Sequence, residues 1–273
     1  MNNQPIGFLD SGVGGLTVVK EVLKQLPNEQ IYYIGDSARN PYGPRPMEEV
    51  RKFTHQLAHF LVDQNIKLLV VACNTATVAA LKSLKEELPV PVIGVIASGT
   101  HAAVLETTND KIGVIGTVGT IESKEYEKQI LNKKENAKVT SVATQEFVAI
   151  VEKNQFESSY AERVVAKELE PFIGTDIDTL VLGCTHYPLL QPIIQDYFGK
   201  EVSLIDPGVE TAKMVEKYLS EEGILNVSTD NTTEHLFFTT GSAERFEEIA
   251  SNWLDYTNFK VKNVLIEELE KYD

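Results

Sequence analysis

The sequence predicts an α/β fold made of two doubly wound, mostly parallel domains that are related by pseudo-symmetry, with a site between them. Short apolar runs recur along the chain, a glycine or polar turn follows each run, and a helical pattern comes next. Such alternation of strands and helices is typical of parallel sheets that are covered by helices. A weak internal repeat points to two similar halves.

The expected elements follow from these patterns. The expected strands are residues 6–9, 31–34, 67–72, 92–95, 111–115, 138–142, 179–182, 202–205, 236–239 and 261–265. The expected helices are residues 16–26, 47–63, 75–88, 124–133, 158–170, 189–198, 211–220 and 243–253. The polar stretch 228–234 is expected to be a surface loop.

The repeat pairs two glycine turns and two cysteines. The first expected strand leads into a glycine-rich turn at residues 10–15, and strand 111–115 leads into a similar turn at residues 116–120. Cys73 directly follows strand 67–72, and Cys184 lies two residues after the end of strand 179–182. Two halves with one glycine turn and one cysteine each are the simplest account, and chance similarity between βα units is the alternative.

Composition limits the classes of function. The 273 residues allow one large domain or two small ones, and 42% hydrophobic with 24% charged residues is ordinary for a soluble globular protein. No apolar run approaches the roughly 20 residues of a membrane helix, and the N-terminus lacks a signal-peptide pattern, so we expect a cytoplasmic protein. The net charge of −15 argues against binding to nucleic acid or anionic membranes. An anionic substrate would need a locally positive site.

The two cysteines favour neither a disulfide nor a metal site. In a reducing cytosol a stable disulfide is not expected, and two cysteines alone cannot complete a structural zinc site. His55 and His59 have i,i+4 spacing but lack the Glu of a zinc-protease motif, so we interpret them as a partly exposed helix face. No metal is expected.

Each cysteine is expected at the carboxyl end of a strand, just before a helix. Ligands of open α/β sheets bind outside these strand ends, and a helix N-terminus lowers the pKa of a thiol. A buried structural cysteine is the alternative for each. One thiolate and one thiol on opposing halves fit a reaction that removes a proton from one face of a carbon and returns it on the other. Disulfide exchange usually needs Cys-x-x-Cys, which is absent.

The first glycine turn does not fit a dinucleotide-binding fingerprint, because Thr17 stands where the third glycine belongs. Its backbone N–H groups can still form a nest for a carboxylate, which would hold an anion without many Lys or Arg side chains. A purely structural tight turn is the alternative.

Four segments together resemble the bacterial glutamate racemase family, a branch of the aspartate/glutamate racemase superfamily: residues 10–18, 35–45, 72–77 and 183–188. The resemblance covers nearly the whole chain. It implies a first domain of residues 1–97 plus 208–273 and a second, inserted domain of residues 98–207. It also implies cofactor-independent interconversion of L- and D-glutamate, whose D-product feeds peptidoglycan synthesis.

The resemblance implies a role for each matching residue. Cys73 takes the α-proton of D-glutamate and Cys184 that of L-glutamate, while Asp10 and His186 assist their respective thiols and Glu152 supports the Cys184 side. The residues implied to hold the substrate are Asp10, Ser11, Tyr42, Gly43, Asn74, Thr75, Thr185 and His186. Thr117 and Thr120 are further candidate hydroxyls.

Purely structural roles are the alternatives for three residues. Asp10 would cap its turn, His186 would be a core histidine, and Glu152 would be a solvated helix residue. Residues 144–149 lack the proline usual in the family at that point, and Asn40 replaces a residue that is often Cys, Thr or Ala.

Other activities stay open as alternatives. They are an aspartate racemase or another superfamily member acting on a small acidic substrate, and a binding protein without catalysis. A pyridoxal enzyme would need a Schiff-base lysine, and none lies in these segments. The expected partner is a small-molecule substrate, with no cofactor, and a homodimer is left open.

Overall fold

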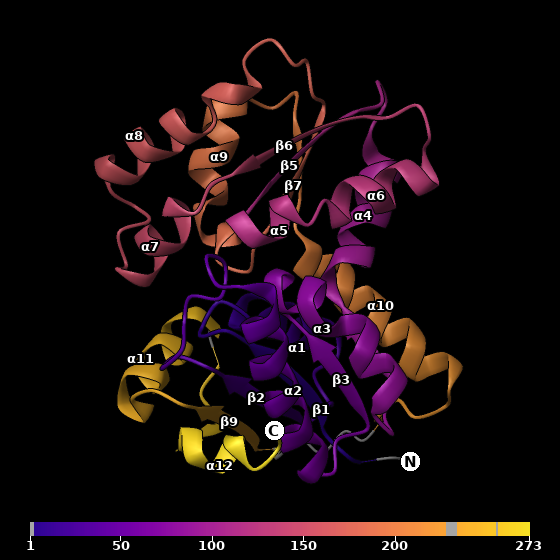
Figure 1. The fold of residues 1–273 in the computed structure, drawn as a ribbon, viewed down its shortest axis with the longest axis vertical. Coiled ribbons are helices and arrows are strands. Elements are labelled where there is room, and N and C mark those ends of the chain that lie inside the picture. Colours follow the sequence, from indigo (N-terminus) through magenta and orange to yellow (C-terminus); the bar gives the residue numbers. More distant parts are fainter. Residues whose placement is uncertain (1–2, 228–233, 255) are drawn as a thin grey trace.

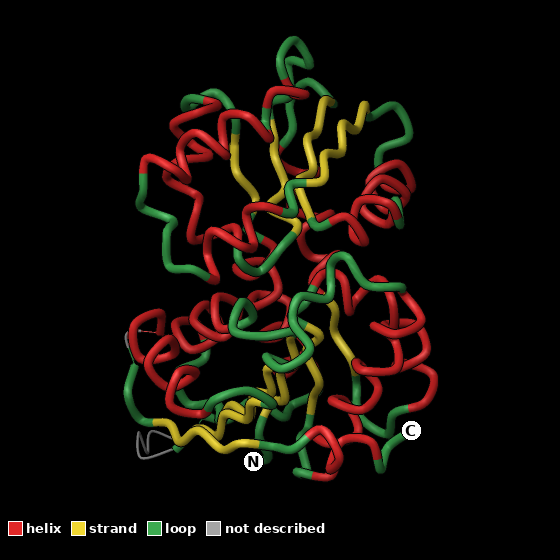
Figure 2. The backbone as a smooth tube through the Cα atoms, turned by 60° about the vertical axis from the view of Figure 1, so that its left-hand side comes forward, coloured by secondary structure: helices red, strands yellow, loops and turns green. Residues whose placement is uncertain are grey.

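The computed structural model describes residues 3–227, 234–254 and 256–273, which form two lobes, each built around one sheet (Figure 1). Of the stretch expected as a surface loop, residues 228–233 lie outside the described residues. The expected fold class is confirmed: every strand pairing in both sheets is parallel, and helices flank the strands in both lobes (Figure 2).

The first sheet has six strands in the order β10-β9-β2-β1-β3-β4. Its strands are β1 (Ile6–Asp10), β2 (Ile31–Gly35), β3 (Leu68–Val71), β4 (Val92–Gly94), β9 (His235–Thr239) and β10 (Phe259–Asn263). The chain leaves this sheet after β4 and returns to it at β9. The C-terminal segment therefore completes the sheet that the N-terminal segment begins.

The second sheet has four strands in the order β6-β5-β7-β8. These strands are β5 (Lys111–Gly116), β6 (Lys138–Ala143), β7 (Thr179–Gly183) and β8 (Ser203–Ile205). Their order repeats the order β2-β1-β3-β4 of the first sheet. The glycine-turn strands β1 and β5 and the cysteine strands β3 and β7 thus hold equivalent central places, as the internal repeat predicts.

Helices cover both faces of each sheet. One face of the first sheet packs on α1 (Leu16–Gln25), α10 (Pro207–Glu221) and α11 (Ala243–Leu254), and the other on α2 (Met47–Asp63), α3 (Asn74–Glu87) and α12 (Ile266–Glu270). The second sheet packs on α7 (Glu146–Glu152), α8 (Ser159–Glu168) and α9 (Gln191–Phe198) on one face, and on α4 (Val95–Glu106) and α6 (Glu125–Lys133) on the other. The short helix α5 (Val118–Glu122) follows β5. Burial on two faces explains why the central strands β1, β3, β5 and β7 are nearly continuous apolar runs, whereas the edge strands β6 and β10 carry exposed polar residues.

Helices α4 and α10 lie where the chain crosses between the lobes, and they pack against each other. Ser98 Oγ and Thr211 Oγ1 are 2.7 Å apart across this contact, and both side chains are buried. A Cβ at Gly99 would lie 2.9 Å from the ring of Pro207, so the close approach needs a glycine on α4. The paired crossing holds the lobes together at one side.

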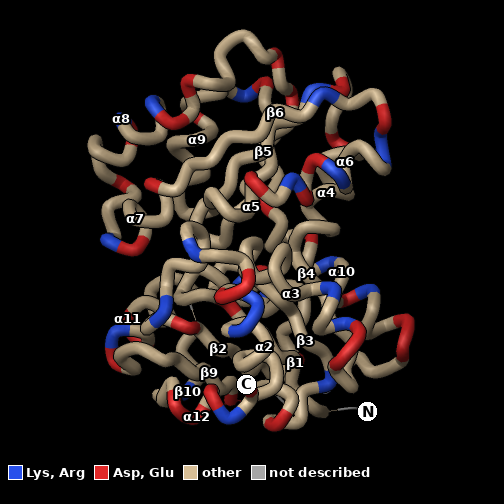
Figure 3. Tube along the Cα trace, viewed as in Figure 1, with Lys and Arg blue, Asp and Glu red and all other residues tan. Residues whose placement is uncertain are grey.

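Lys and Arg residues, and Asp and Glu residues, are scattered along the backbone of both lobes (Figure 3). Within the described ranges, none of the helices has the length and apolar character needed to cross a bilayer.

Candidate active site

A small cavity of about 20 Å³ lies where residues that follow the central strands of both sheets meet. Ser11 follows β1 and Cys73 follows β3, while Thr117 follows β5 and Cys184 follows β7. The winding direction reverses between β1 and β3 in the first sheet and between β5 and β7 in the second. Open α/β sheets bind ligands at such points. The lining is Ser11, Asn40, Pro41, Tyr42, Gly43, Cys73, Asn74, Thr75, Thr117, Gln145, Val148, Cys184, Thr185 and His186.

Cys73 is the N-cap residue of α3. Its sulfur accepts a hydrogen bond from the backbone N–H of Ala76 at 3.4 Å and lies 3.9 Å from Ser11 Oγ. Burial and the negative charge of Asp10 nevertheless raise the pKa of the Cys73 thiol to about 12. The hydrogen bond from the helix N-terminus lowers the pKa of Cys73, as expected, but burial and Asp10 outweigh it. The thiol keeps its proton at neutral pH.

Cys184 follows β7, and the ring of His186, two residues further on, lies beside its sulfur in place of the start of an α-helix. A short 3₁₀ turn (Tyr187–Leu190) comes next, and α9 begins only at Gln191, two residues later than expected. His186 Nδ1 lies 3.7 Å from Cys184 Sγ. Local positive charge at this sulfur must therefore come from the imidazole ring.

His186 is held by a carboxylate on its far side. Its Nε2 lies 2.7 Å from Glu152 Oε1 at the end of α7. Burial alone lowers the pKa of His186, but the hydrogen bonds to Cys184 and Glu152 and their negative charges outweigh it, so the pKa lies well above its ordinary value. The ring is therefore positively charged at neutral pH, beside the sulfur of Cys184.

Glu152 also contacts the other lobe. Asn40 Nδ2 donates a hydrogen bond to Glu152 Oε1 at 3.1 Å, and Arg245 Nη2 donates to the backbone carbonyl of Glu152 at 3.4 Å. Burial raises the pKa of Glu152, but the hydrogen bond and charge of His186 together with Asn40 and Arg245 hold it below the usual value. Glu152 is thus a charged, mostly covered partner of His186.

Asp10 organises the glycine turn. Its carboxylate accepts hydrogen bonds from the backbone N–H groups of Ser11 (2.9 Å) and Gly15 (2.8 Å) and from Thr185 Oγ1 at 3.2 Å. The side chain of Asp10 is fully buried, and this burial raises the pKa of its carboxyl group. The charge of His186 and the hydrogen bonds lower the pKa, but they do not outweigh burial. Asp10 therefore acts as a turn cap and also binds the lobe that carries Cys184.

The glycine turn lets the second lobe approach closely. A Cβ at Gly14 would lie 2.4 Å from Thr185 Oγ1 and 2.6 Å from the His186 ring. Thr17 Oγ1 donates a hydrogen bond to the backbone carbonyl of Thr185 at 2.9 Å. The absence of a side chain at Gly14 is what allows the Cys184 segment to dock here.

Polar groups converge on the opposite wall of the cavity. Tyr126 on α6 donates a 2.7 Å hydrogen bond to Asn74 Oδ1, and Thr75 Oγ1 lies 2.9 Å from Thr117 Oγ1. Thr117 Oγ1 in turn lies 3.0 Å from Thr120 Oγ1. Because Tyr126 occupies the amide oxygen of Asn74, the NH₂ group of Asn74 is left for a ligand acceptor.

No Lys or Arg is among the described residues that line the cavity. An anion there would be held by hydroxyls, amides, backbone N–H groups and the His186 ring, as the sequence suggests.

The sequence identifies most of this site. Every residue predicted to hold the substrate lines the cavity except Asp10, which binds Thr185 from outside the lining, and Glu152 lies on the far side of His186. Asn40, Pro41, Gln145 and Val148 also line it but were not predicted. The unusual segment 144–149 is the sequence signal that would have found Gln145 and Val148.

Chemically, the cavity holds two sulfurs on opposite lobes in different surroundings. The Cys73 side is an uncharged proton donor at neutral pH, and the Cys184 side has a cationic ring next to it. A donor and an acceptor of a proton on two sides of one small cavity are what inversion at a carbon requires.

The chain is similar to proteins of one enzyme family. The family described as Asp/Glu/Hydantoin racemase matches residues 6–215. A glutamate racemase of Carnobacterium sp. (strain St2) is 53% identical over 97% of this chain and 100% of its own length.

Solved structures agree. A glutamate racemase isoform, RacE1, of Bacillus anthracis superposes with a TM-score of 0.93 at 47% identity, over 97% of this chain and 98% of that chain. The glutamate racemase of Francisella tularensis subsp. tularensis SCHU S4, solved in complex with D-glutamate, superposes with a TM-score of 0.90 at 35% identity, over 98% and 99% of the two chains.

Proposed function

The chain belongs to the Asp/Glu/hydantoin racemase family, and we propose that it interconverts L- and D-glutamate by moving the α-proton between Cys73 and Cys184 without a cofactor. The observation that carries the proposal is the shared cavity, which both sulfurs line from different lobes. The high identity to glutamate racemases over nearly the full chain supports glutamate as the substrate.

In the L-to-D direction, Cys184 acts as the thiolate. Its sulfur forms a bond to the α-proton of L-glutamate, and the electron pair of the broken C–H bond stays on the planar carbanion next to the carboxylate. The Cys73 thiol then gives its proton to the opposite face and becomes the thiolate. The high pKa of Cys73 suits this donor role, and the charged His186 ring stabilises negative charge on the Cys184 sulfur. The reverse reaction exchanges the two roles, with Asp10 assisting Cys73.

Substrate is held by Ser11, Asn74, Thr75 and Thr185, with backbone groups of Tyr42 and Gly43. In this proposal the carboxylates of glutamate accept hydrogen bonds from these hydroxyl, amide and backbone groups.

The domain boundaries fall after residues 97 and 207, near the starts of α4 and α10. The product supplies peptidoglycan synthesis in the cytoplasm.

An aspartate racemase is the second candidate, because aspartate carries the same two carboxylates on a shorter chain. The Asp-Ser-Gly-Val-Gly-Gly turn disfavours it. Turnover of the two substrates separates the candidates.

The direct test incubates the purified protein with L-glutamate in deuterated water without added cofactor, and follows optical rotation and α-deuterium together. We expect the rotation to decay to zero while deuterium enters the α-position of D-glutamate. Loss of rotation only with L-aspartate would move the assignment to the second candidate. A folded protein that binds glutamate without exchanging its α-hydrogen would contradict the proposed activity.

Tyr126→Phe is expected to raise the KM for glutamate by about 5- to 10-fold while kcat changes by less than about 3-fold. The substitution removes a single neutral hydrogen bond, worth about 1 kcal/mol, so Asn74 no longer presents its NH₂ group in a fixed direction. Steady-state kinetics in both directions measure the split. Tyr160→Phe, on an exposed tyrosine of the same lobe, is the matched control. An unchanged KM would show that Asn74 does not depend on Tyr126.

A further inference from the structure

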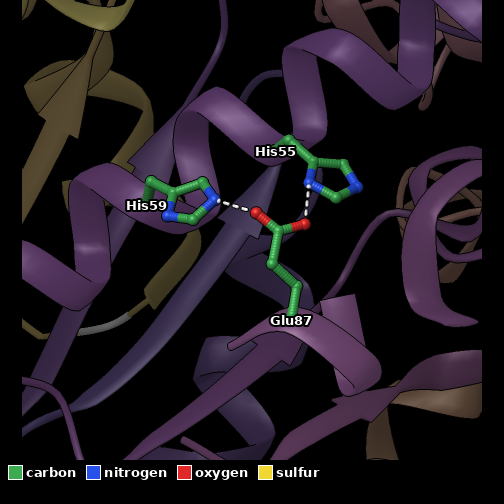
Figure 4. A group of neighbouring side chains, drawn as sticks. All are labelled: His55, His59 and Glu87. Carbon is green, nitrogen blue, oxygen red and sulfur yellow. Dashed lines mark hydrogen bonds and ion pairs between the residues drawn. The ribbon is translucent and has the colours of Figure 1, made fainter. Parts of the chain in front are cut away.

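A cluster of three side chains lies outside the active site and takes no part in the mechanism. His55 and His59 are on one face of α2, and Glu87 is the last residue of α3 (Figure 4). Asn74 starts α3 at the cavity, so at 1.5 Å per residue Glu87 lies about 20 Å from it along the helix. Any role of this cluster is separate from proton transfer.

The three side chains point toward one another. His55 Nδ1 lies 3.1 Å from Glu87 Oε2, and His59 Nε2 lies 2.7 Å from Glu87 Oε1. One ligand atom from each residue lies within 4.8 Å of the other two. Figure 4 shows the carboxylate between the two rings, each oxygen facing one ring nitrogen.

Ser83 contacts His55 on the side of the ring away from Glu87. Ser83 Oγ lies 2.8 Å from His55 Nε2 and can donate its proton to the carbonyl oxygen of Ala80 at 3.0 Å. In the tautomer in which Nε2–H donates to Ser83, the Nδ1 lone pair faces Glu87 Oε2, and a cation between these two acceptors would satisfy both.

We propose that His55, His59 and Glu87 bind one divalent transition-metal ion of the Zn²⁺ type. Two imidazoles and one carboxylate with a fourth position open to water form a known class of zinc ligand set, and softer sulfur ligands are absent from this cluster. The Ser83 hydrogen bond to His55 is the kind of outer contact that orients a metal-binding imidazole.

Only small movements would admit the ion. Tetrahedral ligands at about 2 Å from zinc lie about 3.3 Å apart, so the carboxylate must retreat by a few tenths of an ångström from each ring, and the two ring nitrogens, which lie within 4.8 Å of each other, must come to that separation. Glu87 is 46% exposed and free to do so. His59 is backed by Tyr272, whose ring stacks on it at a centroid distance of 6.0 Å. The charged neighbours of His55 are His59, Glu87 and Arg51.

A bound ion would join the C-terminal end of α3 to α2. Because the ion binds the folded chain, Zn²⁺ at 100 times its Kd is expected to raise the folding equilibrium constant about 100-fold. The active-site cysteines are competing zinc ligands, so the experiment needs a background without them.

The test measures Zn²⁺ binding by calorimetry, and Co²⁺ binding by its visible spectrum, on the chelator-treated full chain carrying Cys73→Ser and Cys184→Ser. We expect one ion per chain, a Co²⁺ spectrum without sulfur charge-transfer bands, and a rise in thermal midpoint with Zn²⁺.

His59→Gln and Glu87→Gln should abolish binding, and Ser83→Ala should weaken it about 10-fold. His101→Gln, on an exposed histidine of α4, is the control that should bind normally. Equal binding in all variants, or no binding in the parent protein, would overturn the proposal, and Ser83→Ala keeps the test decisive if a ligand variant does not fold.

Discussion

Cys73→Ala and Cys184→Ala are each expected to lower the racemisation rate at least about 10³-fold, because each removes the thiol that exchanges the proton on one face of the substrate. General acid and base groups contribute about 10² to 10⁴ each, and inversion needs one on each face. The measurement is loss of optical rotation from either enantiomer, with circular dichroism to verify folding.

The remaining thiol gives the sharper readout. Cys73→Ala retains Cys184, which can remove and return the proton on the L face, so L-glutamate should exchange its α-hydrogen with deuterated water without inversion. Cys184→Ala should do the same for D-glutamate. A variant that still racemises within about 10-fold of the parent rate would refute the two-thiol mechanism.

Enantiomers have equal free energies, so the equilibrium constant for racemisation is one. The kcat/KM values for the L-to-D and D-to-L directions are therefore equal in any variant. A substitution on the Cys184 side must impair both directions, and differences between the sides have to be sought in isotope exchange or in kcat alone.

The sequence could predict the strands and both sulfurs because these signals are local. Strands buried on two faces are continuous apolar runs, and all of the expected strands exist, although β10 covers residues 259–263 instead of 261–265. In the final strand, Phe259 is buried and Leu265 is exposed at the N-cap of α12, so the two C-terminal apolar residues of the expected strand lie beyond the sheet.

Helix α4 could not be predicted from periodicity. It is rich in small residues and packs on α10, α6 and α3, so it shows no single apolar face. Helices α5, α7 and α12 were missed because they have only five to seven residues each. Helix α10 begins at Pro207 and not at residue 211, since Asp206 caps it by accepting a hydrogen bond from Gly208 N.

The contacts across the lobes were beyond sequence reasoning as well. The bond from Asn40 to Glu152 joins residues 112 positions apart, and the pKa of Cys73 depends on the burial of its sulfur and on Asp10, which lies on another strand. Local motif chemistry favoured a lowered thiol pKa, and tertiary burial reversed the direction.

Glu152→Gln is expected to lower kcat/KM by about 10- to 100-fold in both directions, because it removes the charge from a hydrogen bond to His186, and hydrogen bonds to charged groups contribute about 1.5 to 3 kcal/mol. The negative charge of Glu152 is one of the causes that hold the pKa of His186 high, so its loss lowers that pKa. Activity requires the charged ring beside Cys184 and is lost as pH rises through the pKa of His186. The alkaline limb of the pH profile should therefore move to lower pH in the variant.

The pH profile distinguishes this electrostatic role from a structural one. Glu146→Gln, on an exposed residue in the first turn of the same helix, changes charge and volume equally and should leave the alkaline limb in place. If Glu152→Gln lowered the rate uniformly at every pH, Glu152 would serve only to position the ring through its hydrogen bond. A limb displaced to lower pH, with the loss of rate growing toward alkaline pH, would instead show that its charge keeps His186 protonated, which is the condition for Cys184 to act as a base.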